Sequence, residues 1–286
     1  MEFNIFSYTK YYFMSTARLI PSSFIALIFL IASCNNNSST EKTAAPGIKE
    51  ESISYDADSA HMTGFVAWDS GATAKRPVVL IVHEWWGLND YAKKRARQLA
   101  GLGYLAIAVD MYGDGKMGTD PDAAGKLAMP FYAHPEKAKA RFDAALAKIK
   151  TYAQADTSKI AAMGYCFGGA VVLNMARMGE RLKGVVSFHG NLVGVRPDKN
   201  LLMAKILVCH GDSDSFVNPE VATFKKQMDS IHADYTFKTY PNATHAFTNP
   251  DATMLGEKFK MPIRYNAAAD SASWKDMREF FEKIFK

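Results

Sequence analysis

The sequence contains few cysteines and no paired cysteine motif. Its 286 residues include three cysteines, Cys34, Cys166 and Cys209, and no two of them show the C-x-x-C spacing of a redox or zinc site. Three cysteines are also too few for a disulfide framework. Each cysteine is therefore interpreted separately, and we expect neither a metal nor a cofactor.

Concentrated charge is absent as well. The formal net charge of +5 is spread along the chain, and no basic run is interleaved with aromatic residues as in proteins that grip nucleic acid. The composition, 48% hydrophobic and 22% charged, is that of an ordinary globular protein. We therefore expect one folded domain, a monomer, and no nucleic-acid partner.

The N-terminal segment contains an uncharged stretch at residues 19–31, which follows Lys10 and Arg18. This stretch is too short to span a bilayer comfortably, but its length suits the core of a signal peptide. It ends in Ile31-Ala32-Ser33-Cys34, which resembles the bacterial lipobox, where a diacylated cysteine becomes the new N-terminus.

These features predict a lipoprotein signal peptide at residues 1–33, a flexible polar tether at residues 34–49, and a folded domain at residues 50–286. Cys34 would then carry the lipid that holds the protein on a membrane of the cell envelope. The alternatives are a conventionally secreted form and an uncleaved membrane helix.

Short apolar runs alternate with helical patterns through the predicted domain. A hairpin is expected at residues 51–68, and strands at 78–82, 105–109, 160–164, 185–188, 206–209 and 235–240. Helices are expected at residues 90–101, 135–152, from 168 onward, 219–231 and 266–285. This alternation predicts an α/β fold: a doubly wound, mostly parallel sheet with helices on both faces and reactive groups at the carboxyl ends of strands.

Cys166 lies in Gly164-Tyr165-Cys166-Phe167-Gly168-Gly169, between a buried strand and a helix. This is a G-x-C-x-G form of the nucleophile elbow, in which glycines leave room for a strained central residue. A helix N-terminus favours a thiolate over a thiol. The alternative is a buried structural cysteine, or one that forms a disulfide with Cys209.

Two more polar motifs follow strands. After the strand at 206–209 comes a loop that holds His210, Asp212 and Asp214; Asp214 fits the acid position that orients a catalytic imidazole, Asp212 fits a turn cap, and His210 fits a structural histidine. His245 follows the strand at 235–240 and fits the base, with an ordinary surface histidine as the alternative.

The order nucleophile, acid, histidine is that of the α/β-hydrolase fold. It predicts that the Cys166 sulfur attacks an ester carbonyl while His245 acts as the base and Asp214 orients it. The Phe167 N–H, directly after the nucleophile, is the expected oxyanion donor.

The domain resembles the dienelactone hydrolase family from about residue 52 to residue 286. The resemblance rests on His83-Glu84-Trp85-Trp86-Gly87-Leu88-Asn89, Asp110-Met111-Tyr112, the Cys166 elbow, Asp214-Ser215-Phe216-Val217 and His245-Ala246-Phe247. It implies that Glu84 contacts the cysteine thiol at rest and that the Trp85 N–H is the second oxyanion donor. A helix-start carboxylate that faces solvent is the alternative for Glu84.

One departure from the family concerns substrate binding. The family's best-known members hold the lactone's carboxylate with two arginines, and neither arginine is present in the corresponding stretches here; Lys116 or Arg264 are the candidates to replace them. An apolar substrate pocket is expected from four aromatic residues, which could equally be core: Trp86, Tyr112, Phe216 and Phe247.

These patterns together predict a cysteine-dependent hydrolase of small carboxylic esters or lactones. The alternative is a surface lipoprotein that binds a ligand on a hydrolase-like fold without turnover.

Overall fold

The structure is a computed structural model that describes residues 47–71 and 73–286, so the predicted signal peptide, Cys34 and nearly all of the predicted tether lie outside it. Within those residues no helix is both long enough and apolar enough to cross a bilayer.

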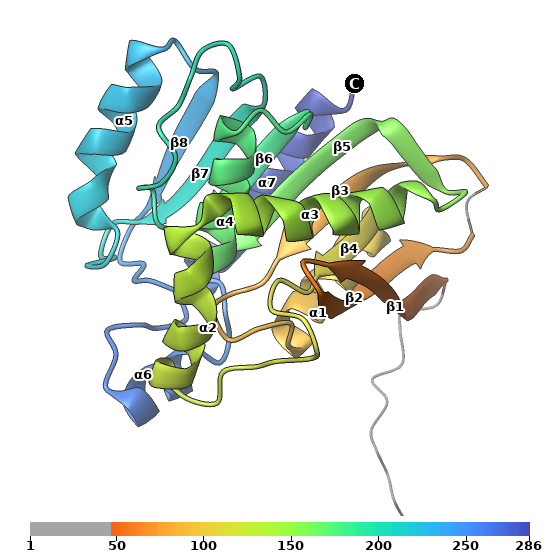
Figure 1. Cartoon of the computed structure of the whole chain (residues 1–286). Coiled ribbons are helices and arrows are strands. Elements are labelled where there is room, and N and C mark those ends of the chain that lie inside the picture. The colour runs from red at the N-terminus through yellow and green to blue at the C-terminus, as the bar shows by residue number, and fades with distance from the viewer. Residues whose placement is uncertain (1–46, 72) are drawn as a thin grey trace, which may run out of the picture. The chain divides into compact units, whose positions relative to one another are not determined.

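One eight-stranded sheet runs through the folded unit, in the order β1-β2-β4-β3-β5-β6-β7-β8 (Figure 1). Only β1 with β2 and β2 with β4 pair antiparallel; every other neighbouring pair is parallel. The strands are β1 Ile48–Ala57, β2 Ala60–Asp69, β3 Arg76–Val82, β4 Leu105–Val109, β5 Ala155–Tyr165, β6 Gly184–Phe188, β7 Lys205–Gly211 and β8 Tyr235–Tyr240. The predicted mostly parallel sheet is confirmed.

Helices cover both faces of this sheet (Figure 1). One face packs against α1 and α7, and the other packs against α2, α3, α4 and α5. Because β4 and β6 are buried at every residue, their apolar runs have no polar alternation. The helices are α1 Asp90–Gly101, α2 Pro121–Ala133, α3 Pro135–Lys150, α4 Phe167–Arg177, α5 Val221–Ser230 with the short η1 Asn218–Glu220 before it, α6 Ala252–Phe259 and α7 Ala267–Ile284.

The predicted hairpin at the N-terminal edge turns at Asp58 and Ser59. Asp58 and Ser59 have φ angles of 49° and 63°, as a two-residue hairpin turn requires. The sheet begins at Ile48, two residues before the predicted start of the domain at residue 50.

Helices α2 and α6 were not predicted from the sequence. Helix α2 has a clear start, because Asp120 accepts a hydrogen bond from the Ala123 N–H, but Gly125 and Pro130 interrupt its helical pattern. Helix α6 is short and buries only two of its residues, so it carries little apolar periodicity. The missed helix α2 forms part of the site described next.

Candidate active site

Cys166 lies at a strained turn between β5 and α4. Its φ of 52° is unusual for a residue with a side chain, and its N–H lies 3.0 Å from the Phe188 oxygen and 3.2 Å from His189 Nδ1. A Cβ at Gly164 would lie 2.1 Å from the Gly168 oxygen, so glycine is required there for close approach. The local backbone is that of a nucleophile elbow.

The thiols of Cys166 and Cys209 are both free. Cys209 is fully buried, and the Tyr240 hydroxyl donates a hydrogen bond to its sulfur over 3.5 Å. The interpretation of these two cysteines as a disulfide is therefore wrong for this structure, because the Cys209 side chain points into the core.

Asp214 and His245 meet at the carboxyl ends of β7 and β8. His245 Nδ1 lies 2.9 Å from Asp214 Oδ2, and the other carboxylate oxygen accepts the N–H groups of Phe216 and Val217. Asp214 is fully buried, whereas Asp212 is exposed and bonds to the neighbouring Ser213 hydroxyl. The structure thus pairs His245 with Asp214.

His210 makes a structural contact, as the sequence suggested. Its Nε2 lies 2.7 Å from Asn218 Oδ1, and the residue is 3% exposed.

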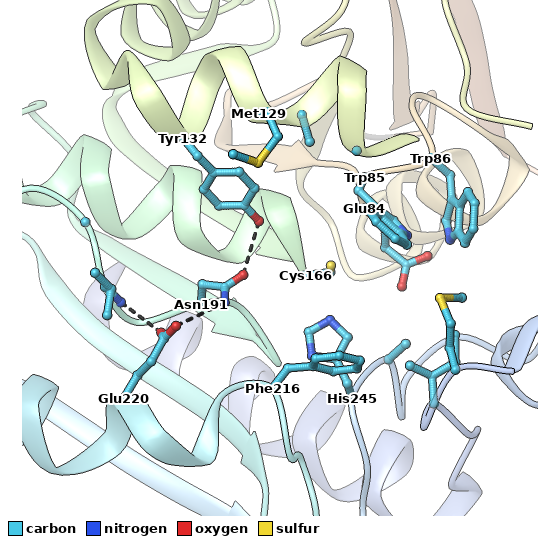
Figure 2. A pocket seen from close by; sticks show the side chains of 17 residues that line it. Glu84, Trp85, Trp86, Met129, Tyr132, Cys166, Asn191, Phe216, Glu220 and His245 are labelled. Atoms are coloured by element: carbon cyan, nitrogen blue, oxygen red, sulfur yellow. Dashed lines mark hydrogen bonds between the residues drawn. The ribbon is translucent and has the colours of Figure 1, made fainter. Parts of the chain in front are cut away.

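The His245 imidazole faces Cys166, with the Phe216 ring beside it (Figure 2). Burial lowers the pKa of His245, but the Cys166 sulfur and the Asp214 carboxylate together raise that pKa well above its ordinary value. Since Nδ1 is committed to Asp214, Nε2 is the nitrogen available to the sulfur. The geometry suits proton transfer from the thiol to the imidazole.

Glu84 is buried at 2% exposure, so it does not face solvent. Its carboxylate accepts a hydrogen bond of 2.6 Å from the Asn249 amide, and within the described residues it makes none to Cys166. Burial raises the pKa of Glu84 to about 7, although the Asn249 bond and the nearby His245 act to lower it. The carboxylate is thus hydrogen-bonded to the Asn249 amide rather than to the thiol, and both Glu84 and Cys166 line the same cavity.

The two expected oxyanion donors have no backbone acceptor within the part of the chain that the structure describes. Phe167 is the first residue of α4, directly after Cys166, and Trp85 lies at the cavity beside Glu84. Their N–H groups are therefore available to a substrate oxygen.

A cavity of about 490 Å³ opens onto Cys166 and His245 (Figure 2). Trp86 and Phe216 line it as predicted, but Tyr112 and Phe247 do not. Tyr112 is 3% exposed, and its hydroxyl donates to the Trp85 carbonyl oxygen over 2.9 Å; Phe247 is fully buried against His189. Assigning these two residues to the pocket was wrong, because their side chains point into the core.

The profile described as the dienelactone hydrolase family matches residues 62–285. The chain belongs to this family. A solved structure titled a dienelactone hydrolase-like promiscuous phosphotriesterase, P91, from metagenomic libraries has a TM-score of 0.79 and 33% sequence identity, covering 84% of this chain and 100% of that one.

Curated relatives of the hydrolase show comparable similarity. An Escherichia coli K12 protein, named provisionally as a carboxymethylenebutenolidase, is 29% identical over 226 residues, which is 72% of this chain and 77% of that protein. The Caenorhabditis elegans protein K02A2.1 is 33% identical over 153 residues, which is 52% of this chain and 95% of that protein. The chain is a hydrolase of the dienelactone hydrolase type with the α/β-hydrolase fold.

His189 is a further residue of the site in this hydrolase, one that the sequence did not predict. His189 follows β6 directly, and its Nδ1 accepts the Cys166 N–H, so its Nε2 donates to the Thr248 hydroxyl over 2.7 Å. Burial, followed by the neighbouring His245, holds the pKa of His189 well below its ordinary value, which keeps this acceptor neutral. Its position at a strand end was the available signal, the same one that marked Asp214.

The cavity wall opposite His245 was missed as well. It is built by α2, by the loop after His189 and by η1, and its polar residues are Tyr132, Asn191 and Glu220. No motif marked these residues: Tyr132 lies in the unpredicted helix α2, Asn191 in the loop after His189, and Glu220 in the segment predicted as a helix at residues 219–231.

Neither proposed replacement for the family's arginines reaches the cavity. Lys116 is exposed and pairs with Asp114 at 2.9 Å, whereas Arg264 lies at a separate depression. In the described part of the chain no lysine or arginine lines the cavity around Cys166.

Proposed function

We propose that this protein is a cysteine-dependent hydrolase of carboxylic esters, with Cys166 as nucleophile, His245 as base and Asp214 as the residue that orients His245. The observation that carries the proposal is the buried Asp214–His245 hydrogen bond of 2.9 Å, whose imidazole faces a cysteine in a strained elbow. Such strain is costly and clusters at functional sites. A protein that only binds a ligand has no need of a cysteine, an aspartate and a histidine at three strand-end loops.

The reaction proceeds in two halves. The thiol proton passes to His245 Nε2 as Sγ bonds to the carbonyl carbon, and the oxyanion is held by the N–H groups of Phe167 and Trp85. The carbonyl reforms, and His245 gives its proton to the departing alcohol. A water molecule, deprotonated by His245, then attacks the thioester carbon. The C–S bond breaks, the acid is released, and the proton passes from His245 back to the Cys166 sulfur.

The ionisation of Glu84 changes the charge beside His245. A carboxyl with a pKa of about 7 beside His245 is partly ionised near neutrality, where it stabilises the imidazolium.

The test is hydrolysis of 4-nitrophenyl acetate by the parent protein, Cys166→Ala and Cys209→Ala. We expect iodoacetamide to abolish the parent activity, Cys166→Ala to be inactive, and Cys209→Ala to keep its activity, because Cys209 lies away from the cavity. Equal activity in the parent and Cys166→Ala would reject the proposal.

We also propose that residues 1–33 are removed as a signal peptide and that Cys34 is lipidated, so that the hydrolase is held at the cell envelope. The lipobox-like Ile31-Ala32-Ser33-Cys34 supports this. Expression in a bacterium fed labelled palmitate should label the parent and not Cys34→Ala. An unlabelled parent would reject the anchor and leave the catalytic proposal untouched.

A further inference from the structure

The charged side chains around the cavity are acidic, apart from the histidine. Two carboxyl groups line it, Glu84 and Glu220, and within the described residues no lysine or arginine does. Figure 2 shows the two carboxyl groups at opposite ends, with Cys166 between them. A substrate bound to Cys166 therefore lies between two acidic residues.

Glu220 is fixed in this position by hydrogen bonds. Its Oε2 accepts the N–H groups of Leu192 at 2.5 Å and Val193 at 3.0 Å, and its Oε1 accepts the Asn191 amide at 3.2 Å. The Tyr132 hydroxyl donates to Asn191 Oδ1 over 3.1 Å, which holds that amide in place. The donors are all uncharged, and they orient the carboxylate without neutralising it.

The cation that interacts with Glu220 lies behind the wall. Arg177 is 1% exposed, donates to the Leu192 carbonyl oxygen over 2.7 Å, and does not line the cavity. Glu220 acts electrostatically to raise the pKa of Arg177, although burial lowers that pKa more strongly, and the hydrogen bonds of the Arg177 guanidinium within the described residues go to Leu192 and Asn174. Glu220, and not Arg177, therefore lines the cavity that a ligand would enter.

We propose that the site takes esters that are uncharged or carry a cation, that it rejects esters bearing a carboxylate, and that Glu220 is the specificity-determining residue. This rests on the proposed ester hydrolysis. An anionic substrate would bring a negative charge toward fixed carboxyl groups in a partly buried cavity, where charges are weakly screened. The site therefore differs from one built to hold a lactone carboxylate with basic side chains.

The first experiment compares three 4-nitrophenyl esters of similar acyl length: butyrate, hemiglutarate and 4-(trimethylammonio)butyrate. We expect kcat/KM for the anionic ester to be about tenfold below that of the neutral ester, and the cationic ester to equal or exceed the neutral one. Raising NaCl should narrow the gap in part, because salt screens the approach of the charged ester through solvent more than its interactions inside the cavity, whereas a steric effect would not change. An anionic ester hydrolysed as well as the neutral one would overturn the proposal.

The variant Glu220→Gln tests whether Glu220 causes the discrimination against the anionic ester. It keeps the shape and an acceptor oxygen, and should reduce the discrimination against hemiglutarate to about threefold or less. The matched control is Glu279→Gln on α7, which removes the same charge at an exposed position and should leave the ranking unchanged. If a folded Glu220→Gln ranks the three esters by kcat/KM as the parent does, Glu220 does not determine the specificity. If the variant does not fold, the parent's ranking of the esters and its salt dependence decide the substrate class.

A second measurement needs no turnover. Alkylation of Cys166 by iodoacetate, which is anionic, is compared with alkylation by neutral iodoacetamide, with Cys166→Ala as the blank. Glu220→Gln should raise the iodoacetate-to-iodoacetamide rate ratio about threefold or more, and an unchanged ratio would count against the proposal. If the parent does not hydrolyse the neutral ester but Glu220→Gln still raises the iodoacetate-to-iodoacetamide ratio, the proposal of ester hydrolysis is rejected. The proposed electrostatic selection at the cavity would then still hold.

Discussion

The strand-end rim and the cavity wall of this hydrolase are built in different ways. The strand-end rim consists of Cys166, Asp214 and His245, which are held by a strained elbow and a buried hydrogen bond at the ends of sheet strands. The cavity wall consists of α2, the loop at residues 189–194 and η1, and it includes exposed apolar side chains such as Met129 and Val193. The comparison indicates that the strand ends hold the proposed catalytic groups, whereas a helix, a loop and a 3₁₀ turn outside the sheet would set what the site accepts.

Asp214→Asn, at the strand-end rim, is expected to lower kcat/KM more than any of the changes that follow. The amide would offer an N–H where His245 Nδ1–H needs an acceptor, so the wrong tautomer would face Cys166. We expect kcat/KM to fall by about a thousandfold or more, by analogy with the same change in serine hydrolases. Circular dichroism should show a folded variant, and a loss below about tenfold would mean that Asp214 does not orient His245.

Gly168→Ala should destabilise the strand-end rim, because the added Cβ would clash with the backbone. An added Cβ would lie 2.2 Å from the Val82 carbonyl oxygen, which belongs to the central strand β3 and cannot move aside. We expect a loss of about 3 kcal/mol or more in the free energy of unfolding, as measured by urea denaturation. The control is Gly125→Ala on α2, where the added Cβ meets nothing within 4 Å and should be tolerated.

Glu84 lies between the rim and the cavity and gives a pH-dependent test. Its folded pKa of about 7 lies above the ordinary 4.5, so the folded protein retains a proton that the unfolded chain has lost. Stability should therefore decrease as pH rises from about 4.5 through 7. In Glu84→Gln this decrease should be smaller by about 3 kcal/mol, measured as the difference in unfolding free energy between pH 4.5 and 8.

The exposed Glu279→Gln serves as the control for that experiment, since its carboxylate lies at the surface. Parallel stability curves for the parent and Glu84→Gln would contradict the raised pKa.

The smallest effect is expected in the wall from Met129→Ala. This side chain is 59% exposed at the cavity, so its loss removes little buried surface. We expect a change in unfolding free energy within about 0.5 kcal/mol and a shift confined to KM for bulky esters. A large loss of kcat would show that the cavity wall participates in the chemistry, and would remove the contrast between the two regions.

Much of the fold was predictable because its strands are short apolar runs. The strand at residues 105–109 and the helix at 90–101 have the predicted bounds, and the triad candidates lie at strand ends as expected. Helix α2 was not predicted, because Gly125 and Pro130 disrupt a pattern that tertiary contacts override.

Side-chain direction could not be predicted from position along the chain. Phe216 and Phe247 both follow predicted site residues closely, yet Phe216 borders the cavity and Phe247 is core. Likewise Glu84, which was expected to contact the Cys166 thiol, lies at the cavity but is hydrogen-bonded to Asn249, a partner 165 residues away that had no local signal.

The sequence by itself determined the alternation of strands and helices, the glycines that permit the elbow, and the order of the proposed catalytic residues along the chain. These features depend on local sterics and on hydrophobic periodicity, both of which are determined by residues close together along the chain. Only the tertiary structure decided that Glu220 lies across the cavity from Glu84, that His189 supports the Cys166 backbone, and that no basic side chain in the described chain lines the pocket. Those facts depend on the distances between segments remote in sequence, and such distances are set by packing.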